Sequence, residues 1–210
     1  MFRSTLCRRT MLAVLAVAPW LATALNAADK PAPLRSLLIT GGCCHDYPVQ
    51  VRIITQGLSQ RANIEWDVIH EGGTSSDHKV SVYGDEDWAK RYDVIVHNEC
   101  FGAVKDDMFV KSIVAHHDGV PAVFIHCALH SYRNSGAAES WRELIGVTSR
   151  SHEGKRAVDV VCLEAEHPIM HGFPAKWRTP NGELYKIEKV WPNCTPLAQA
   201  YGSIPRRTTR

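Results

Sequence analysis

Short apolar segments alternate with amphipathic segments along the first two thirds of the chain. Four apolar segments, each followed by polar residues, predict β-strands at residues 34–40, 64–69, 92–96 and 120–125. Between them, apolar residues recur at helical spacing after Pro48 and around Met108 and Ile113. Strands that alternate with helices are typical of an α/β fold with a mostly parallel sheet and right-handed crossovers.

This alternation weakens toward the carboxyl terminus. A helix around Trp141 is predicted to end at Gly146, because glycine readily adopts the left-handed conformation that closes helices. Beyond it, the sequence predicts a strand at 158–163, a turn-rich loop at 166–174 and a short strand at 183–185.

Imidazole, thiol and carboxylate side chains follow the predicted strands. The fourth strand ends directly before His126, Cys127 and His130. The other strands are followed by His45, Glu71 and Glu99. Because the carboxyl ends of parallel strands meet at one edge of a sheet, where open α/β sheets bind their ligands, we expect these side chains to converge.

The composition is that of one globular domain. Of the 210 residues, 45% are hydrophobic and 22% are charged, which is sufficient for a single core. The 24 basic and 22 acidic residues leave a formal net charge of +2, with no long basic stripe interleaved with aromatic residues. Nucleic acid is therefore not an expected partner.

The amino terminus has the pattern of a secretory signal peptide. Arg3, Arg8 and Arg9 precede an apolar stretch at residues 11–25, and small residues follow it. We expect residues 1–28 to be a signal peptide and the mature protein to be periplasmic or extracellular. The general secretory route and, given the paired arginines, the twin-arginine route are both compatible with this pattern. An uncleaved anchor is the alternative; without one, no membrane contact is expected.

A strand, a sharp turn and a helix around His126 resemble a nucleophile elbow, in which a tight turn projects a side chain above the sheet. His126 holds the elbow position, which makes it the main candidate for proton transfer or ligand binding. Cys127 follows it, and a catalytic thiolate paired with His130 or His152 is an alternative interpretation. Most other thiols are interpreted as small buried hydrophobes, since no CxxC spacing predicts a structural zinc site.

Eleven histidines provide candidate metal ligands. His45 and His126, together with Glu99 or Glu183, match the donors of zinc or a similar divalent ion. Such an ion would activate water or polarise a carbonyl group. No short ligand motif such as HExxH is present, so histidines that act by hydrogen bonding or proton transfer without a metal are the alternative.

Aromatic and basic side chains near these positions predict a sugar-binding wall, with faces for stacking and donors for hydroxyl groups. The candidate substrate-binding residues are Tyr132, Arg133, Trp141, His152 and Tyr185. Packing in the core is the alternative role, above all for Trp141.

Six short motifs carry a resemblance to a known family. They are GGCCHD (41–46), YDVIVHNE (92–99), VFIHCALH (123–130), WRELIG (141–146), EHPIM (166–170) and GELY (182–185). Together they resemble the ThuA-like (trehalose utilisation) proteins. The resemblance implies a flavodoxin-like, class I glutamine amidotransferase-like three-layer sandwich and a role in carbohydrate metabolism, with 3-keto sugars or disaccharides as substrates. It also implies loss of the elbow cysteine of true amidotransferases, in agreement with His126 at that position.

The carboxyl terminus departs from the family pattern. Family members continue past the stretch matching residues 196–202 into a further strand, a Gly-His motif and a closing helix, whereas this sequence continues into a basic segment at 203–210. We expect a ThuA-like domain at residues 29–202 without this last strand and helix, followed by a disordered basic tail.

These observations predict an exported protein that acts on a keto sugar or disaccharide by histidine–carboxylate or metal-assisted chemistry. Hydrolysis, elimination and isomerisation are the reactions considered. The candidate catalytic residues are His126, His130, Glu99 and Cys127. A non-catalytic sugar-binding module and a cysteine hydrolase based on Cys127 are the alternatives, and the protein could form a homo-oligomer.

Overall fold

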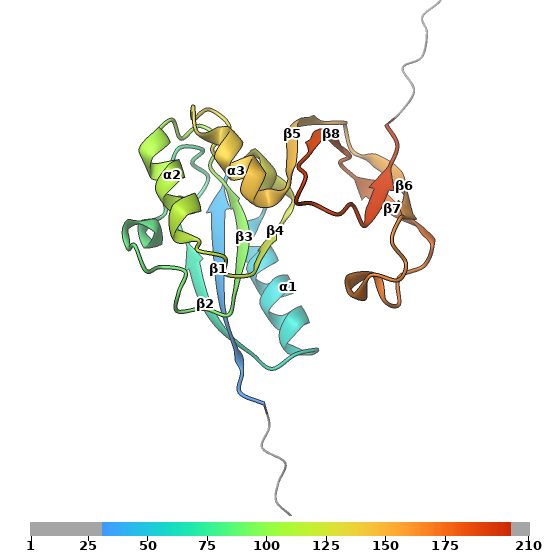
Figure 1. Cartoon of the computed structure of the whole chain (residues 1–210), viewed down its shortest axis with the longest axis horizontal. Coiled ribbons are helices and arrows are strands. Elements are labelled where there is room, and N and C mark those ends of the chain that lie inside the picture. The colour runs from blue at the N-terminus through green and yellow to red at the C-terminus, as the bar shows by residue number, and fades with distance from the viewer. Residues whose placement is uncertain (1–30, 203–210) are drawn as a thin grey trace, which may run out of the picture. The chain divides into compact units, whose positions relative to one another are not determined.

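A four-stranded parallel sheet organises the first half of the described chain, residues 31–202 of the computed structural model (Figure 1). Its strands are β1 (Leu34–Gly42), β2 (Ile64–His70), β3 (Val94–Cys100) and β4 (Ala122–Phe124). They lie in the order β2-β1-β3-β4 with every neighbouring pair parallel, so the predicted α/β fold with a mostly parallel central sheet is confirmed. The predicted signal peptide at 1–28 and basic tail at 203–210 lie outside the described residues.

The third strand extends further than its apolar pattern predicts. It pairs with β1 residue by residue as far as Gly42 and Cys100. The polar residues His97, Asn98 and Glu99, predicted to follow the strand, therefore lie within it. Pairing in the parallel ladder satisfies the backbone groups whatever the side-chain polarity, and this tertiary constraint outweighs the local pattern.

Three α-helices accompany this sheet: α1 (Tyr47–Ser59), α2 (Asp107–His116) and α3 (Ala138–Ile145). At the starts of α1 and α2, the carboxylates of Asp46 and Asp106 each accept a hydrogen bond from a backbone N–H. At the end of α3, Gly146 adopts the left-handed conformation with φ 94°, as the sequence predicted.

Alternation along the strands assigns the helices to opposite faces of the sheet. Leu37 and Ile95 pack in the main hydrophobic core with Trp141 and residues of α2. Val96, which points the other way, lines an apolar groove together with Ile54 of α1. The helices α2 and α3 lie side by side (Figure 1), so α1 covers one face and this pair covers the other.

Antiparallel strands make up the second half of the described chain. These are β5 (Val147–His152) paired with β8 (Tyr185–Val190), and β6 (Arg156–Cys162) paired with β7 (Lys176–Gly182) and β9 (Ala198–Ala200). The sequence predicted a strand near β6 but only a short one at 183–185. In the structure Glu183 lies between β7 and β8 instead. Within the described part of the chain, residues 32–202 belong to one compact unit.

Short 3-10 helices connect several of these elements. They are η1 (Ser81–Gly84), η2 (His126–His130) and η3 (Pro168–Met170). Within the described residues no helix is long and apolar enough to cross a lipid bilayer, and α1, the longest, has only 13 residues against the roughly 20 that a bilayer requires.

Polar side chains are buried within the main core. The Oε1 atom of Glu99 accepts a hydrogen bond from the Tyr83 hydroxyl at 2.7 Å and lies 3.0 Å from Nδ1 of His97. The His97 ring stacks on Phe124 at a centroid distance of 4.7 Å. Because buried polar groups need partners, this arrangement ties β3 to η1 and makes the carboxylate part of the core.

The buried His117, at the end of α2, makes stability depend on pH. Burial, together with the neighbouring His97, lowers the pKa of His117 from 6.5 to about 4. Between these two pH values the unfolded chain binds a proton at His117 that the folded chain does not. The free energy of unfolding should therefore fall as the pH drops from 6.5 toward 4, by about 2 kcal/mol over the first 1.5 pH units.

The measurement is urea unfolding of the wild type and of His117→Phe at pH 7 and pH 5. Phenylalanine fills a similar volume and does not titrate, so the variant should lose less stability between the two pH values. Equal losses in the two proteins would show that His117 does not cause the dependence.

Candidate active site

The candidate site lies at the carboxyl ends of β1, β3 and β4. His45 follows β1, Cys100 ends β3, and His126 and Cys127 follow β4. Parallel strands deliver these segments to the same edge of the sheet, where ligand sites of open α/β sheets form.

A strained turn positions the side chains that follow β4. His126 begins η2 with φ 47°, in the left-handed region that residues other than glycine rarely occupy. Such a conformation costs roughly 1–3 kcal/mol and persists only when the surrounding structure holds it. The turn leaves the donor atoms of His126 and Cys127 within 4.8 Å of each other at the strand end.

Cys127 is held among hydrogen-bonding groups. Its sulfur lies 3.0 Å from Nε2 of His45 and 3.3 Å from the hydroxyl of Tyr185. The pKa of Cys127 falls to about 3, because the Cys100 thiol can donate a hydrogen bond to the sulfur. His126, Tyr185 and the charge of His45 lower this pKa further, whereas burial raises it. These contacts favour the thiolate form of Cys127, whose sulfur lies beside the imidazole of His45.

His126 is the centre of a second polar group. Its Nε2 atom lies 3.5 Å from Oε2 of Glu183, and its Nδ1 atom lies 3.4 Å from the Tyr185 hydroxyl. A hydrogen bond to the Cys127 sulfur and the negative charges of Cys127 and Glu183 raise the pKa of His126, while burial and Lys155 oppose the shift. The raised pKa favours the imidazolium form, and an imidazole side chain can both accept and donate protons.

Aromatic rings stack behind these groups. The Tyr185 ring lies parallel to His130 at a centroid distance of 4.4 Å and to His152 at 5.3 Å. Burial lowers the pKa of His130, which is therefore neutral at physiological pH. The stack holds Tyr185 in place, and with it the hydroxyl that contacts Cys127 and His126.

Two cavities adjoin at this site. The main cavity, of about 390 Å³, is lined by polar groups that include Cys127, His130, Arg133 and Asn134. The outer cavity, of about 560 Å³, is lined by His126, Lys155, Asn181 and other residues. His45 and Glu183 line both cavities, whose volumes are in the usual range for sites that bind small molecules.

The structure brings together most of the side chains that the sequence predicted for the site. These are His45, His126, Cys127, His130, Arg133, His152, Glu183 and Tyr185. It places the other three, Glu99, Tyr132 and Trp141, in the core with 0% exposure, so we do not assign them to the site. For Glu99 the reason is that β3 continues past it, with its side chain on the face that packs against α2 and α3.

Glu71 also lies apart from the site residues. Its carboxylate contacts Nε2 of His78 at 2.9 Å and accepts hydrogen bonds from the backbone N–H and hydroxyl of Ser81. These contacts connect the end of β2 to η1.

Sequence reasoning missed the thiols that lie beside Cys127. Cys43, Cys44 and Cys100 line the main cavity, and the sulfur atoms of Cys43 and Cys100 are 3.8 Å apart. It also paired Cys127 with His130 or His152, whereas the structure places the imidazole of His45 3.0 Å from the Cys127 sulfur. Position along the sequence could have predicted these contacts, because all of these residues follow or end neighbouring strands of one parallel sheet.

A divalent ion fits part of this site. The donor atoms of His45, His126 and Cys127 all lie within 4.8 Å of one another. Two imidazoles and a thiolate are a suitable ligand set for zinc, with Glu183 in reach of His126. Glu99, the other predicted carboxylate ligand, is in the core and does not fit.

Among comparisons with a family model and with solved structures, the family model identifies the family of this chain. A family model described as "Trehalose utilisation" (ThuA) matches residues 45–206. A solved ThuA-like protein of Parabacteroides merdae ATCC 43184 has a TM-score of 0.58 and 18% identity, covering 82% of this chain and 70% of its own. Another, of Bacteroides uniformis ATCC 8492, has a TM-score of 0.61 and 15% identity, covering 84% of this chain and 71% of its own. None of the curated proteins matches this chain.

Proposed function

Because the chain belongs to the ThuA (trehalose utilisation) family, with its flavodoxin-like, glutamine amidotransferase-like fold, we propose that it acts on a keto sugar or keto disaccharide by proton transfer through His126. The reaction is isomerisation or elimination next to the carbonyl group of the sugar. The predicted signal peptide supports export to the periplasm or the extracellular space as the place of action.

The pair formed by His126 and Glu183 carries this proposal. The two side chains are 3.5 Å apart, they border a cavity, and the histidine side chain is 37% exposed. A carboxylate beside an imidazole stabilises the imidazolium that forms when the imidazole takes up a proton. General acid–base catalysis requires a proton carrier of this kind within reach of bound substrate.

The cavities accommodate a sugar with two rings or with a ring and a substituent. Arg133 and Asn134 supply hydrogen-bond donors in the main cavity, and Lys155 and Asn181 supply them in the outer one. A disaccharide that spans both cavities would pass Glu183, which lines both of them, and His126 beside it in the outer cavity, where the reacting carbon would lie.

In the proposed reaction, neutral His126 removes the proton from the carbon next to the sugar carbonyl, and the electron pair moves to the carbonyl oxygen. In isomerisation, imidazolium at His126 returns the proton to the former carbonyl carbon, while the hydroxyl proton on the deprotonated carbon passes to the former carbonyl oxygen and a new carbonyl group forms. In elimination, the carbonyl group re-forms, the electron pair makes a carbon–carbon double bond, the carbon–oxygen bond of the leaving group breaks, and imidazolium at His126 protonates the departing oxygen. Glu183 stabilises the imidazolium, and Tyr185 orients the ring through its contact with Nδ1.

The test is proton exchange into keto sugars followed by nuclear magnetic resonance in deuterated water. We expect deuterium to appear next to the carbonyl group of a 3-keto glucoside or 3-keto disaccharide. Tyr185→Phe should keep the ring stack but lose the hydroxyl, which is worth about 1 kcal/mol, so the exchange rate should fall about fivefold. Binding without any exchange, with or without added zinc, would instead indicate a sugar-binding module.

A cysteine hydrolase is a second candidate function, favoured by the distance of 3.0 Å between the Cys127 sulfur and His45. A thiolate paired with an imidazole is the nucleophile of such enzymes. Trapping an acyl group on Cys127 from an ester substrate, detected by intact mass and absent in Cys127→Ala, would support this function over proton transfer at a keto sugar.

A further inference from the structure

Three thiols outside the proton-transfer group form a cluster of their own at the edge of the sheet. Cys43 and Cys44 follow β1, and Cys100 is the last residue of β3. Their sulfur atoms all lie within 4.8 Å of one another. The proton-transfer reaction uses none of these thiols, and of the three the Cys127–His45 pair involves only Cys100, as a hydrogen-bond donor to the Cys127 sulfur.

The backbone is arranged so that two adjacent cysteines reach the same point. Side chains of consecutive residues in an extended segment point to opposite sides, which would separate Cys43 from Cys44. Cys44, however, has φ 88°, a left-handed conformation that is unfavourable for a residue with a Cβ atom. This turn brings the Cys44 thiol back toward Cys43 and Cys100.

The spacing of the thiols fits coordination of one ion. The sulfur atoms of Cys43 and Cys100 are 3.8 Å apart, well beyond a disulfide bond. Two thiolates on a tetrahedral zinc ion, each at about 2.3 Å, are separated by about 3.8 Å. The cysteines also line the main cavity, which gives an ion access and leaves a coordination position open to a small ligand.

We propose that Cys43, Cys44 and Cys100 bind a single thiolate-preferring metal ion, Zn²⁺ or Cu⁺, at the wall of the main cavity. Soft thiolate ligands select these ions over harder ones such as Mg²⁺ and Ca²⁺. On binding, each coordinating thiol releases its proton to solvent, and the ion exchanges water for sulfur. The proposal does not rest on the sugar reaction, because ion binding is measured without any sugar.

The experiment uses the full chain, reduced, freed of metal and titrated in separate arms with Zn²⁺, with Cu⁺ and with Co²⁺ as a spectroscopic probe. We expect one ion per chain at this site and thiolate-to-Co²⁺ charge-transfer absorption that Zn²⁺ abolishes. Cys44→Ser should weaken Zn²⁺ or Cu⁺ binding at least about tenfold and reduce the absorption, as should Cys100→Ser. The ion with the lower dissociation constant, Zn²⁺ or Cu⁺, is the one that the site prefers.

Matched variants separate this site from its neighbours. Cys162→Ser changes a half-buried thiol at the end of β6 and should leave the titration unchanged. Cys44 is exposed, so Cys44→Ser should preserve the fold. This variant therefore tests the site even if replacement of the buried Cys100 unfolds the protein. The proposal is overturned if Cys44→Ser leaves the titration unchanged, or if Cys127→Ser alone abolishes binding, which would place the ion on the His45, His126 and Cys127 ligands. The proposal is also overturned if the reduced chain takes up no ion.

Discussion

We expect His126→Asn to lower the rate of proton exchange into a keto sugar by about 10²- to 10⁴-fold, the usual contribution of a positioned acid–base group. Asparagine lacks a group that titrates near neutral pH. It tolerates the left-handed conformation better than most residues, so the turn with φ 47° should remain. The loss should therefore appear in turnover and not in folding.

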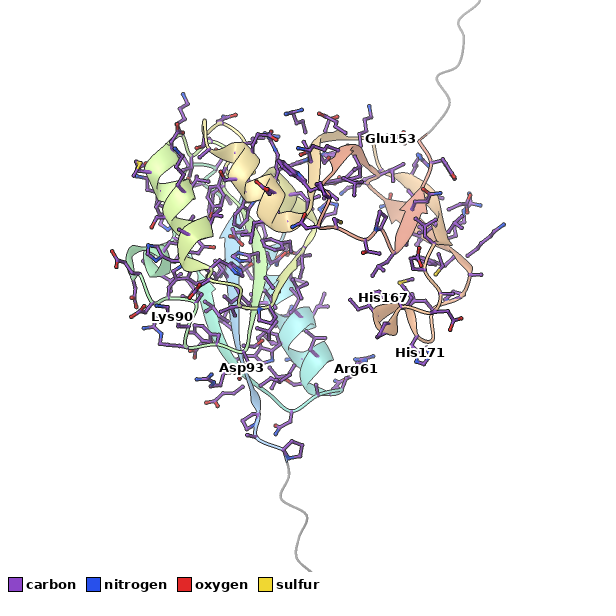
Figure 2. All side chains as sticks on the ribbon, in the orientation of Figure 1. Arg61, Lys90, Asp93, Glu153, His167 and His171 are labelled. Carbon is purple, nitrogen blue, oxygen red and sulfur yellow. The ribbon has the colours of Figure 1, made fainter. Side chains whose placement is uncertain are left out.

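The measurement combines the exchange rate with the melting temperature of each variant. His171→Asn is the matched control, because His171 is an exposed histidine beside η3 (Figure 2) that lines neither cavity of the site. It should leave both the rate and the melting temperature unchanged. If His126→Asn exchanged protons as fast as the wild type, His126 would have no part in the proton transfer.

The second large effect concerns stability. Trp141→Ala should lower the free energy of unfolding by about 3–5 kcal/mol, the usual range for removal of a large buried aromatic side chain. The Trp141 ring is fully buried and packs edge-on against Tyr132 and Phe124, with centroids 4.9 Å and 5.3 Å away. Its Nε1–H donates a hydrogen bond of 2.9 Å to the carbonyl oxygen of Ala128.

Urea unfolding of the wild type, Trp141→Ala and Trp141→Phe measures this effect. Phenylalanine keeps part of the packing but loses the hydrogen bond to η2, so we expect an intermediate loss. Since Ala128 belongs to the same short helix as His126 and Cys127, the alanine variant should also react with thiol reagents at Cys127 more readily. A loss below about 1 kcal/mol for Trp141→Ala would mean that the core can close around the missing ring.

Placing Trp141 in the core settles a choice that the sequence left open. Its aromatic ring suited a sugar-binding wall as well as a hydrophobic core, because single residues carry no information about what faces them. Arg133 lines the main cavity, whereas its neighbour Tyr132 is buried. Residues adjacent in sequence thus have different surroundings, which only the packing of α3 and η2 decides.

The pattern of apolar segments by itself determined the four parallel strands, the three helices near their observed positions and the edge of the sheet where His126 and Cys127 emerge. It could do so because hydrophobic periodicity and the geometry of parallel sheets are local and general constraints. The motif set likewise indicated the family that the comparisons identify.

Tertiary structure alone decided which groups meet. The pairing of β3 with β1 buried Glu99, although its polarity suggested a strand end. The turn between β7 and β8 brought Glu183 to within 3.5 Å of His126, across 57 positions of sequence, and the loop after β1 brought His45 to Cys127. Contacts between distant segments depend on strand register and on backbone conformations such as the left-handed turns at His126 and Cys44. Hydrophobic periodicity predicts neither the register nor these conformations.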